Sequence, residues 1–281
     1  MCGIFGIISK QKVILSELKL LAEHARQRGR DSSGLIINSA DKYNVYRADY
    51  DIKKLMSGIN VSDSTIALGH SRLITNGLSD NQPVIRGDVC VIHNGIVVNY
   101  ESLWEDLKLD RRQEIDTEII AAVTEQYINE KFSLEGLSNK VLSLCKGVVA
   151  TAIVVPKLGK MILFSNNGSL YVGSKGNTFY FSSEQYPLTN LGCNEIKQII
   201  NEEVILDIPS EEHILVKDDN SRKFNLIPKF VKIQSEINLL EYPHPQLRRC
   251  TKCILPETMP YISFDEHGVC TVSYTHLTLP T

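Results

Sequence analysis

The sequence predicts an α+β fold whose strands pair mainly antiparallel. Expected strands come first, expected helices gather in the middle of the chain, and strands return after them. Tight-turn signals such as the Asn-Asn-Gly at 166–168 separate successive strands, which favours antiparallel pairing over repeated strand–helix–strand units. The 281 residues, 43% hydrophobic and 22% charged, have a globular composition that allows one large domain or two small ones.

The expected elements follow from hydrophobic periodicity. Residues 3–8 form an apolar run of strand type, and residues 16–27 carry leucines and alanines at helical spacing with Ser16 as the expected N-cap. Further strands are expected at 34–38, 43–47, 65–69, 87–95, 147–155, 161–165, 169–172, 178–182, 203–207 and 213–216. Further helices are expected at 100–108, 116–130 and 133–145.

Charge and cysteine usage narrow the class of protein. The net charge of -3 and the pI of about 6.2 provide no basic field, so we expect no nucleic-acid partner and no attraction to anionic lipid. The apolar run at the start is too short for a leader or a membrane span, so we expect a cytoplasmic protein without membrane insertion. Seven cysteines in a reducing compartment argue against a disulfide framework, and we expect Cys90 and Cys145 in the core.

Cys2 directly follows the initiator methionine, whose removal we expect. Removal leaves a thiol and a free α-amine on one residue. The amine has a pKa of about 7.7–8.0 and the thiol one of about 8.5, so the amine can accept the thiol proton at neutral pH. A nucleophile with its base on the same residue is the N-terminal-nucleophile arrangement. By itself this start is weak evidence, because an ordinary cysteine explains most Met-Cys starts.

Five further segments strengthen the interpretation of Cys2. After the start MCGIFGI come RGRDSSG at 28–34, LGHSRLITNG at 68–77, NQPV at 81–84, VIHNGIVVNYESL at 91–103 and EIDTEIIAAV at 114–123. In this order they resemble class II glutamine amidotransferases, the glutaminase domains of glucosamine-6-phosphate synthase, asparagine synthetase and amidophosphoribosyltransferase. The resemblance covers roughly residues 2–220. It implies the four-layer αββα sandwich of N-terminal-nucleophile hydrolases, with L-glutamine as substrate and no cofactor for this domain.

The resemblance implies three catalytic residues. Cys2 attacks the side-chain amide carbon of glutamine, and the tetrahedral oxyanion that forms needs fixed donors. Asn94 supplies a side-chain amide, and Gly95 supplies a backbone N–H that its missing Cβ allows to approach closely. Taken alone, the His-Asn-Gly sequence would more simply be a turn that closes a strand.

The resemblance also implies the residues that bind the substrate. Arg72 grips the α-carboxylate with its planar guanidinium, and Asp116 binds the α-ammonium. The turn of Thr75, Asn76 and Gly77 helps to close the pocket. The alternatives are a surface ion pair for Arg72 and a helix N-cap for Asp116, and a cap carboxylate is compatible with substrate binding.

A supporting role is expected for the loop at 28–34. Arg28 and Asp31 are expected to organise the backbone beside Cys2 rather than take part in chemistry. Arg30 stands where the family more often has proline or tyrosine, at a variable position. His70 and His93 are not proposed as bases, because the family pattern places the base on the N-terminal amine.

The expected domain organisation has four parts. The glutaminase domain spans 2–225, with a charged and polar domain edge at 217–227, and a proline-containing linker spans 226–249. Residues 250–271 form the truncated start of a synthetase module. The last ten residues, 272–281, depart from the preceding composition and look like a translated sequencing adapter, so we expect the natural gene to continue differently after about Thr271.

The late cysteines have the spacing of a metal site. Cys250 and Cys253 form a Cys-x-x-Cys, and Cys270 follows. Structural zinc sites need four ligands, so these three predict a zinc site in the complete protein with a fourth cysteine elsewhere, or with the weaker candidate His267. The alternatives are a redox pair, disfavoured because no thioredoxin-like helix follows, and unrelated cysteines.

Residues 248–270 also resemble the start of the N-acetyl sugar amidotransferase family of surface polysaccharide synthesis. The resemblance rests on three motifs: the Cys-x-x-Cys, the Leu-Pro-Glu-Thr-Met-Pro stretch and the Phe-Asp-Glu-His-Gly-Val-Cys run. The resemblance implies that the complete protein activates a sugar with ATP and aminates it with ammonia from the glutaminase. A fused or associated synthetase would then hold the ammonia acceptor. The alternatives are a different synthetase, such as a glucosamine-6-phosphate synthase or asparagine synthetase type, or a silent glutamine-binding regulatory domain.

Overall fold

The computed structural model describes residues 2–39, 42–77, 80–219 and 246–273. The chain divides into two units, Met1–Leu226 and Ile227–Thr281, which are described separately below. The expected domain limits stay a prediction. Most of the expected linker at 226–249 and of the suspect segment at 272–281 lies outside the described residues.

Two β-sheets form the centre of the first unit. The larger sheet has the strand order β11-β9-β10-β1-β4-β2-β3-β13. Its strands are β1 (Gly3–Ser9), β2 (Ser32–Asn38), β3 (Tyr43–Ala48), β4 (Ile66–Arg72), β9 (Tyr171–Lys175), β10 (Thr178–Ser182), β11 (Asn194–Gln198) and β13 (Ile214–Asp219). The smaller sheet has the order β12-β8-β7-β6-β5. Its strands are β5 (Val84–Arg86), β6 (Val89–Val97), β7 (Gly147–Val155), β8 (Lys160–Ser165) and β12 (Glu202–Asp207).

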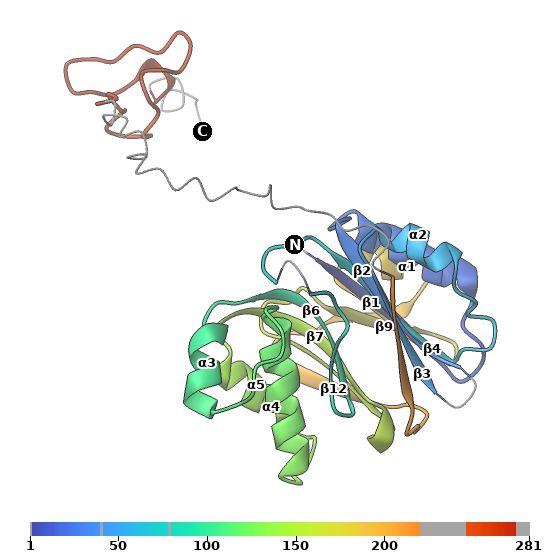
Figure 1. Cartoon of the computed structure of the whole chain (residues 1–281). Coiled ribbons are helices and arrows are strands. Elements are labelled where there is room, and N and C mark those ends of the chain that lie inside the picture. The colour runs from blue at the N-terminus through green and yellow to red at the C-terminus, as the bar shows by residue number, and fades with distance from the viewer. Residues whose placement is uncertain (1, 40–41, 78–79, 220–245, 274–281) are drawn as a thin grey trace. The chain divides into compact units, whose positions relative to one another are not determined.

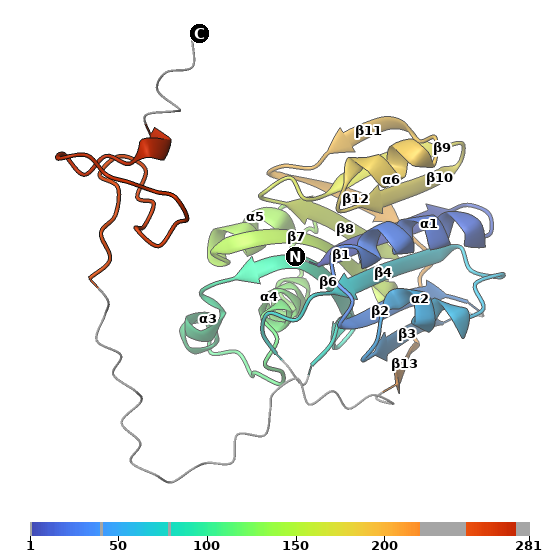
Figure 2. The same cartoon turned by 90° about the horizontal axis from the view of Figure 1, so that it is seen from above.

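Helices cover the outer face of each sheet (Figures 1 and 2). The larger sheet is covered by α1 (Leu15–Arg26), α2 (Ile52–Ser57) and α6 (Gln185–Asn190). The smaller sheet is covered by α3 (Tyr100–Leu107), α4 (Thr117–Asn129) and α5 (Leu137–Leu144). The layers therefore run helix, sheet, sheet, helix, which is the expected αββα sandwich.

Strand alternation explains how one sequence fills three apolar layers. Because successive side chains of a strand point to opposite faces, Ile4 of β1 packs between the sheets while Phe5 and Ile7 pack against the helices. On β6, Cys90 and Ile92 likewise face the space between the sheets. Each large apolar side chain fully buried there stabilises the fold by roughly 1.5–3 kcal/mol.

The expected antiparallel pairing is confirmed for the described strand pairs, except that β13 pairs parallel with β3. β13 follows β12, which lies in the other sheet, so the chain crosses between sheets and joins this edge in parallel. The strand continues to Asp219, so residues 217–219 belong to the sheet and not to the domain edge expected at 217–227.

Several local expectations were wrong. The strand expected at 87–95 begins two residues later, as β6 at Val89, because the chain turns at Gly87 (φ +52°) after β5, and it continues to Val97 instead of ending in a loop at 93–95. Ser16 is not the N-cap of α1, since Ile14 holds that position without a side-chain cap. The helices α2 and α6 and the strand β11 were not predicted. For α2 a signal existed, because the Asp51 carboxylate caps it by accepting from the backbone N–H groups of Lys53 and Lys54.

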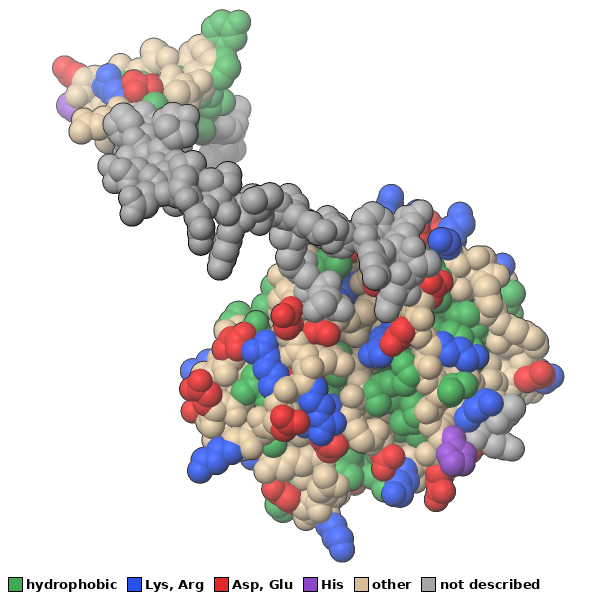
Figure 3. Space-filling view, viewed as in Figure 1, with side chains coloured by type: hydrophobic (Ala, Val, Ile, Leu, Met, Phe, Trp, Pro, Cys, Tyr) green, Lys and Arg blue, Asp and Glu red, His purple; other side chains and the backbone are tan. Residues whose placement is uncertain are grey.

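The surface of the first unit has no single-sign field on the face drawn in Figure 3, where acidic and basic side chains are interspersed. This agrees with the net charge of -3. Among the described residues, none of the helices has the length and hydropathy needed to span a membrane.

The second unit is small. Cys250, Val269 and Cys270 are buried, with Leu255, Ile262, Phe264 and Val272 packed around them. Among the described residues its strand-like pairing consists of isolated bridges, such as Phe264 with Cys270.

Candidate active site

Cys2 lies directly before β1, at the end of the space between the two sheets. Cys2 is two positions before Ile4, which faces that space, so alternation places the Cys2 side chain on the same face. The side chain is 7% exposed, and its thiol donates to the carbonyl of Leu73 across 3.5 Å.

The surroundings of Cys2 control its ionisation. Burial raises the pKa of the Cys2 thiol above its usual value, and the Leu73 contact and the positive charge of Arg72 only partly oppose this effect. Asp116 acts in the same direction as burial. The thiol is therefore protonated at neutral pH, and attack on a substrate requires a base to accept its proton.

Asn94 reaches the same space from the second sheet. It continues the row of Cys90 and Ile92 on β6, and its amide nitrogen donates to Ser183 Oγ across 3.4 Å. Ser183 Oγ in turn accepts from the backbone N–H of Ile4 at 2.9 Å. The Asn94 amide has two N–H donors, so one remains for a ligand. Its buried oxygen has no hydrogen-bond partner within the described residues.

Gly95 is required by close approach of the backbone. A Cβ at this position would lie 1.9 Å from the carbonyl oxygen of Val148 and 2.6 Å from His93 Nε2. The residue pairs with Val149 in the middle of the β6–β7 ladder. The Asn94-Gly95 pair is therefore part of a strand rather than a closing turn, contrary to the simpler alternative.

Asp116 stands at the N-cap position of α4 but does not cap it. Its backbone is helical (φ -60°, ψ -27°), and its side chain makes no cap bond. Instead, its carboxylate accepts from the backbone N–H of Val97 at 2.8 Å and is 4% exposed. This carboxylate turns toward the end of β6, close enough to Cys2 and Arg72 for its charge to act on both.

Arg72 ends β4 and is buried, with 2% exposure, so it is not a surface ion pair. Its guanidinium donates to the carbonyl of Gly77 at 3.0 Å and to those of Asn76 and Asp80. The guanidinium thus holds the turn that follows β4.

The turn at 75–77 lies against the start of the Asp116 segment. Gly77 has φ +56°, and a Cβ there would lie 2.7 Å from the backbone nitrogen of Ile115. The Asp80 carboxylate also accepts from this N–H at 3.2 Å. Thr75 is exposed and Asn76 is partly exposed. The turn therefore connects Arg72 to Asp116, the two residues expected to bind the ends of the substrate.

Arg28 and Asp31 fasten the backbone around Cys2. Arg28 Nε donates to the carbonyl of Cys2 at 2.7 Å, and its Nη1 pairs with Glu184 at 2.6 Å. The Asp31 carboxylate accepts from the N–H of Ile74 at 2.8 Å. These contacts tie the 28–34 loop to the backbone of Cys2 and to the segment that follows β4.

Comparison with known proteins agrees with this geometry. Residues 70–190 match the family described as "Glutamine amidotransferase domain". The chain is 29% identical over 237 residues to a glutamine–fructose-6-phosphate aminotransferase (isomerizing) of Campylobacter jejuni, covering 79% of this chain and 38% of the relative. It is 26% identical over 258 residues to the protein of the same name from Halalkalibacterium halodurans, covering 88% and 42%. The chain contains a class II glutamine amidotransferase domain.

Solved structures confirm the fold of the amidotransferase domain. Glutamine phosphoribosylpyrophosphate amidotransferase from B. subtilis, complexed with ADP and GMP, matches with a TM-score of 0.61 and 23% identity. The match covers 73% of this chain and 47% of that one. The chain spans about two fifths of the length of the curated relatives it matches.

His70 and His93 are buried and neutral. Burial lowers the pKa of His93 and lowers that of His70 well below the usual value. The His93 Nε2 contacts the carbonyl of Val148 at 3.2 Å, and Nδ1 lies 3.4 Å from Thr117 Oγ1. For His70, a hydrogen bond with the backbone of His93 offsets only part of the effect of burial on the pKa of the ring. Neither ring bonds to the Cys2 thiol among the described contacts.

Two residues of the amidotransferase site were missed by the sequence analysis. Ser183 connects Ile4 to Asn94, and Glu184 holds Arg28. They follow β10, about 180 residues after Cys2, and carry no local pattern. Only the strand pairing could have located these two residues. Because β10 pairs antiparallel with β1, the residues that follow β10 lie beside the start of β1.

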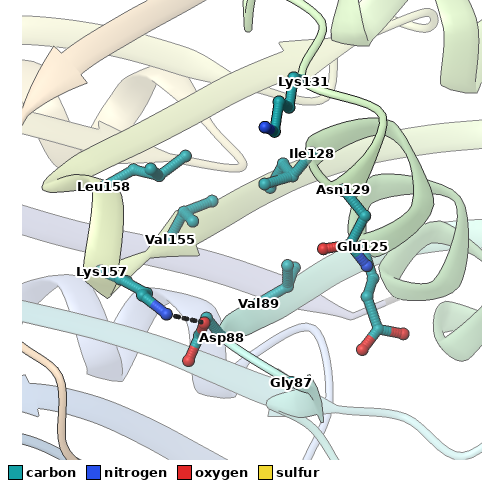
Figure 4. Close-up of a pocket in the computed structure, with 10 residues that line it drawn as sticks. All are labelled: Gly87, Asp88, Val89, Glu125, Ile128, Asn129, Lys131, Val155, Lys157 and Leu158. Carbon is teal, nitrogen blue, oxygen red and sulfur yellow. Dashed lines mark ion pairs between the residues drawn. The ribbon is translucent and has the colours of Figure 1, made fainter.

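A surface pocket of about 440 Å³ lies away from Cys2 (Figure 4). The start of β6, the end of α4 and the 3₁₀ turn Pro156–Leu158 contribute to its lining, and Lys157 pairs there with Asp88 at 3.7 Å. Val89 lines the pocket, and Asn94 lies five residues further along β6, about 17 Å away at strand rise. None of the site residues named above lines this pocket, so it is separate from the candidate active site.

Proposed function

We propose that this domain hydrolyses L-glutamine to glutamate and ammonia, with Cys2 as the nucleophile. The observation that supports the proposal is that residues from both sheets face one common space. Cys2 before β1 and Asn94 on β6 face the same space, and Ser183 connects Asn94 to the backbone of Ile4, two positions after Cys2. The proposed nucleophile and the proposed oxyanion donor are thus positioned by strands of two packed sheets.

Opposite charges orient the substrate. Free glutamine carries an α-carboxylate and an α-ammonium, which Arg72 and Asp116 complement. The Arg72 guanidinium is occupied by backbone carbonyls in this structure, so a bound carboxylate replaces some of these contacts. That exchange links substrate binding to the position of the turn at 75–77, which closes over the ligand.

The reaction then proceeds through a thioester. After removal of Met1, the α-amine of Cys2 accepts the thiol proton as sulfur bonds to the amide carbon of glutamine. The Asn94 amide and the Gly95 N–H stabilise the oxyanion. The adduct collapses, the C–N bond breaks, and the amine returns its proton to the departing ammonia. Water hydrolyses the thioester and releases glutamate. No cofactor takes part in these steps.

The ammonia passes to a synthetase module that aminates a sugar, which we place in surface polysaccharide synthesis. The resemblance of residues 248–270 to an N-acetyl sugar amidotransferase supports this acceptor and implies ATP for the complete protein. The names of the relatives support a second candidate, fructose-6-phosphate. Amination of the acceptor that requires ATP would favour the first candidate over the second.

Cys2→Ala tests the nucleophile. We expect glutamate release from L-glutamine to fall to the uncatalysed background, because no other described thiol or hydroxyl replaces this sulfur. Intact mass should show that wild-type protein has lost Met1. Cys193→Ser, a partly exposed thiol elsewhere in the domain, is the matched control and should retain turnover. Glutamate release by folded Cys2→Ala at the wild-type rate would refute the proposal.

A further inference from the structure

Three cysteine side chains of the second unit converge on one point. The sulfur atoms of Cys250, Cys253 and Cys270 all lie within 4.8 Å of one another. The sulfurs of Cys253 and Cys270 lie 3.4 Å apart. A tetrahedral zinc ion with bonds of about 2.3 Å holds its sulfur ligands about 3.8 Å apart. The spacing of the three thiols therefore suits a shared ion.

Backbone N–H groups point at these sulfurs. Cys250 Sγ accepts from the N–H of Lys252 and of Cys253, each at 3.4 Å, and from that of Cys270 at 3.3 Å. Cys270 Sγ accepts from the N–H of Ser273 at 3.4 Å. Donors directed at sulfur stabilise thiolates, and thiolate is the form that binds a metal.

The turns that carry the cysteines are joined directly. The N–H of Thr251 donates to the carbonyl of Gly268 at 3.0 Å, and that of Cys250 donates to Leu255 at 2.9 Å. Gly268 has φ +75°, which suits the tight turn before Cys270. The backbone thus places the two cysteine segments face to face.

The described residues of the second unit, 246–273, contain too little apolar material to hold this shape alone. They bury one small cluster that includes two of the cysteines. Chains below about 40 residues usually need a disulfide, a metal or oligomerisation to fold. A metal bound by the three thiols would supply the stabilisation that this small apolar cluster lacks.

Position 273 lies beside the thiols of Cys250 and Cys270, and it is occupied here by Ser273, a residue of the segment in which the natural gene is expected to differ. The Ser273 hydroxyl lies 3.4 Å from Cys250 Sγ and 3.6 Å from Cys270 Sγ, and the residue is buried. The spacing Cys270-x-x-Ser273 repeats that of Cys250-x-x-Cys253. His267, the weaker candidate, is not in the cluster. We propose that the second unit binds one structural zinc ion through Cys250, Cys253 and Cys270, and that position 273 is the place of the fourth ligand.

The whole chain, purified with reductant and supplied with zinc chloride, tests the site. We expect one zinc per chain by elemental analysis. Cobalt(II) in its place should give the thiolate-to-metal charge-transfer absorption of a tetrahedral sulfur site. Cys253→Ser should lower metal retention against a chelator by at least about tenfold, as expected when a ligand is lost. Cys193→Ser, in the first unit, should retain the metal like the wild type.

Ser273→Cys makes the test independent of folding defects, because it predicts a gain. A fourth thiolate should increase zinc retention by at least about tenfold and shift the cobalt absorption toward that of a four-sulfur site. The proposal fails if reduced wild-type protein takes up no stoichiometric metal, or if Ser273→Cys leaves metal retention unchanged. A mass lower by two hydrogens, with Cys253 and Cys270 joined in a disulfide under reductant, would also overturn it.

Discussion

At the scale of single residues, the proposed chemistry depends on where the thiol proton of Cys2 goes. Burial raises the pKa of this thiol, so it does not ionise spontaneously at neutral pH. Burial also lowers the pKa of both nearby histidines, and neither bonds to the sulfur among the described contacts. The α-amine left by removal of Met1 is then the base available on the same residue.

This assignment predicts the pH dependence of the reaction. The amine accepts a proton only when it is neutral, and its usual pKa is about 7.7–8.0. The kcat/KM for glutamine should therefore fall about tenfold per pH unit below that pKa. Glutamate release measured across pH would show it. A profile controlled by a group that titrates well below pH 7 would point to a histidine instead.

The fold must be monitored in the same experiment. Since the folded-state pKa of His70 and His93 is lowered, the unfolded chain binds protons more readily than the folded one. The stability that these neutral rings contribute is present above the unfolded pKa of about 6.5 and is lost as pH falls toward the folded values. Circular dichroism at each pH separates this loss from the titration of the amine.

Asp116→Asn separates charge from structure at the substrate site. The amide oxygen of asparagine can still accept from the N–H of Val97, so the end of β6 keeps its hydrogen bond. The α-ammonium of glutamine loses its counter-charge, a charge-assisted contact of about 1.5–3 kcal/mol. We expect KM for glutamine to rise about 10- to 100-fold with a smaller change in kcat. An unchanged KM would remove Asp116 from substrate binding.

At the scale of elements, a buried ion-pair cluster fastens α4 to the smaller sheet. Arg86 of β5 pairs with Glu118 at 2.8 Å and with Glu125 at 3.0 Å. The side chains of Arg86 and Glu118 are 4% and 1% exposed, whereas that of Glu125 is 26% exposed. Glu118 also accepts from the N–H of Gln113 at 2.7 Å, which fixes the chain just before Asp116.

Glu118→Ala should therefore destabilise the domain strongly. It leaves the Arg86 guanidinium buried without its closest carboxylate, and breaking a buried pair costs about 3–5 kcal/mol. Urea unfolding followed by circular dichroism measures this loss. Glu125→Ala is the matched control and should cost less, because this carboxylate is partly solvated. If both variants lost the same free energy of unfolding, burial would not be what makes the Arg86–Glu118 pair costly to break.

Local patterns were enough to predict most elements, and their failures have physical causes. The boundaries of α3, α4 and β7 were close to the observed ones because their apolar spacing is regular over eight or more residues. The short elements α2, α6 and β11 were missed, since five or six residues carry too little periodicity. The parallel pairing of β13 depends on a crossover between sheets that no local pattern records.

At the scale of the whole molecule, the candidate site is built from segments that are distant in the sequence. Family resemblance supplied Cys2, Arg72, Asn94 and Asp116, and the structure shows which contacts connect their surroundings. Ser183 could not be predicted, because its place follows from the β1–β10 pairing rather than from any neighbouring residue. That the Arg72 guanidinium holds backbone carbonyls likewise depends on the folded turn.

The two units have separate tasks, which metal removal can test. The groups proposed for glutaminase chemistry, from Cys2 to Glu184, all belong to the first unit, and a thiol with its own amine needs no metal. Stripping the chain with a chelator should therefore remove zinc from the thiols of the second unit while kcat and KM for glutamine hydrolysis stay unchanged. Elemental analysis and glutamate release on the same sample provide the measurement. If turnover falls with the metal while the first unit stays folded by circular dichroism, the zinc site supports catalysis and the units are coupled.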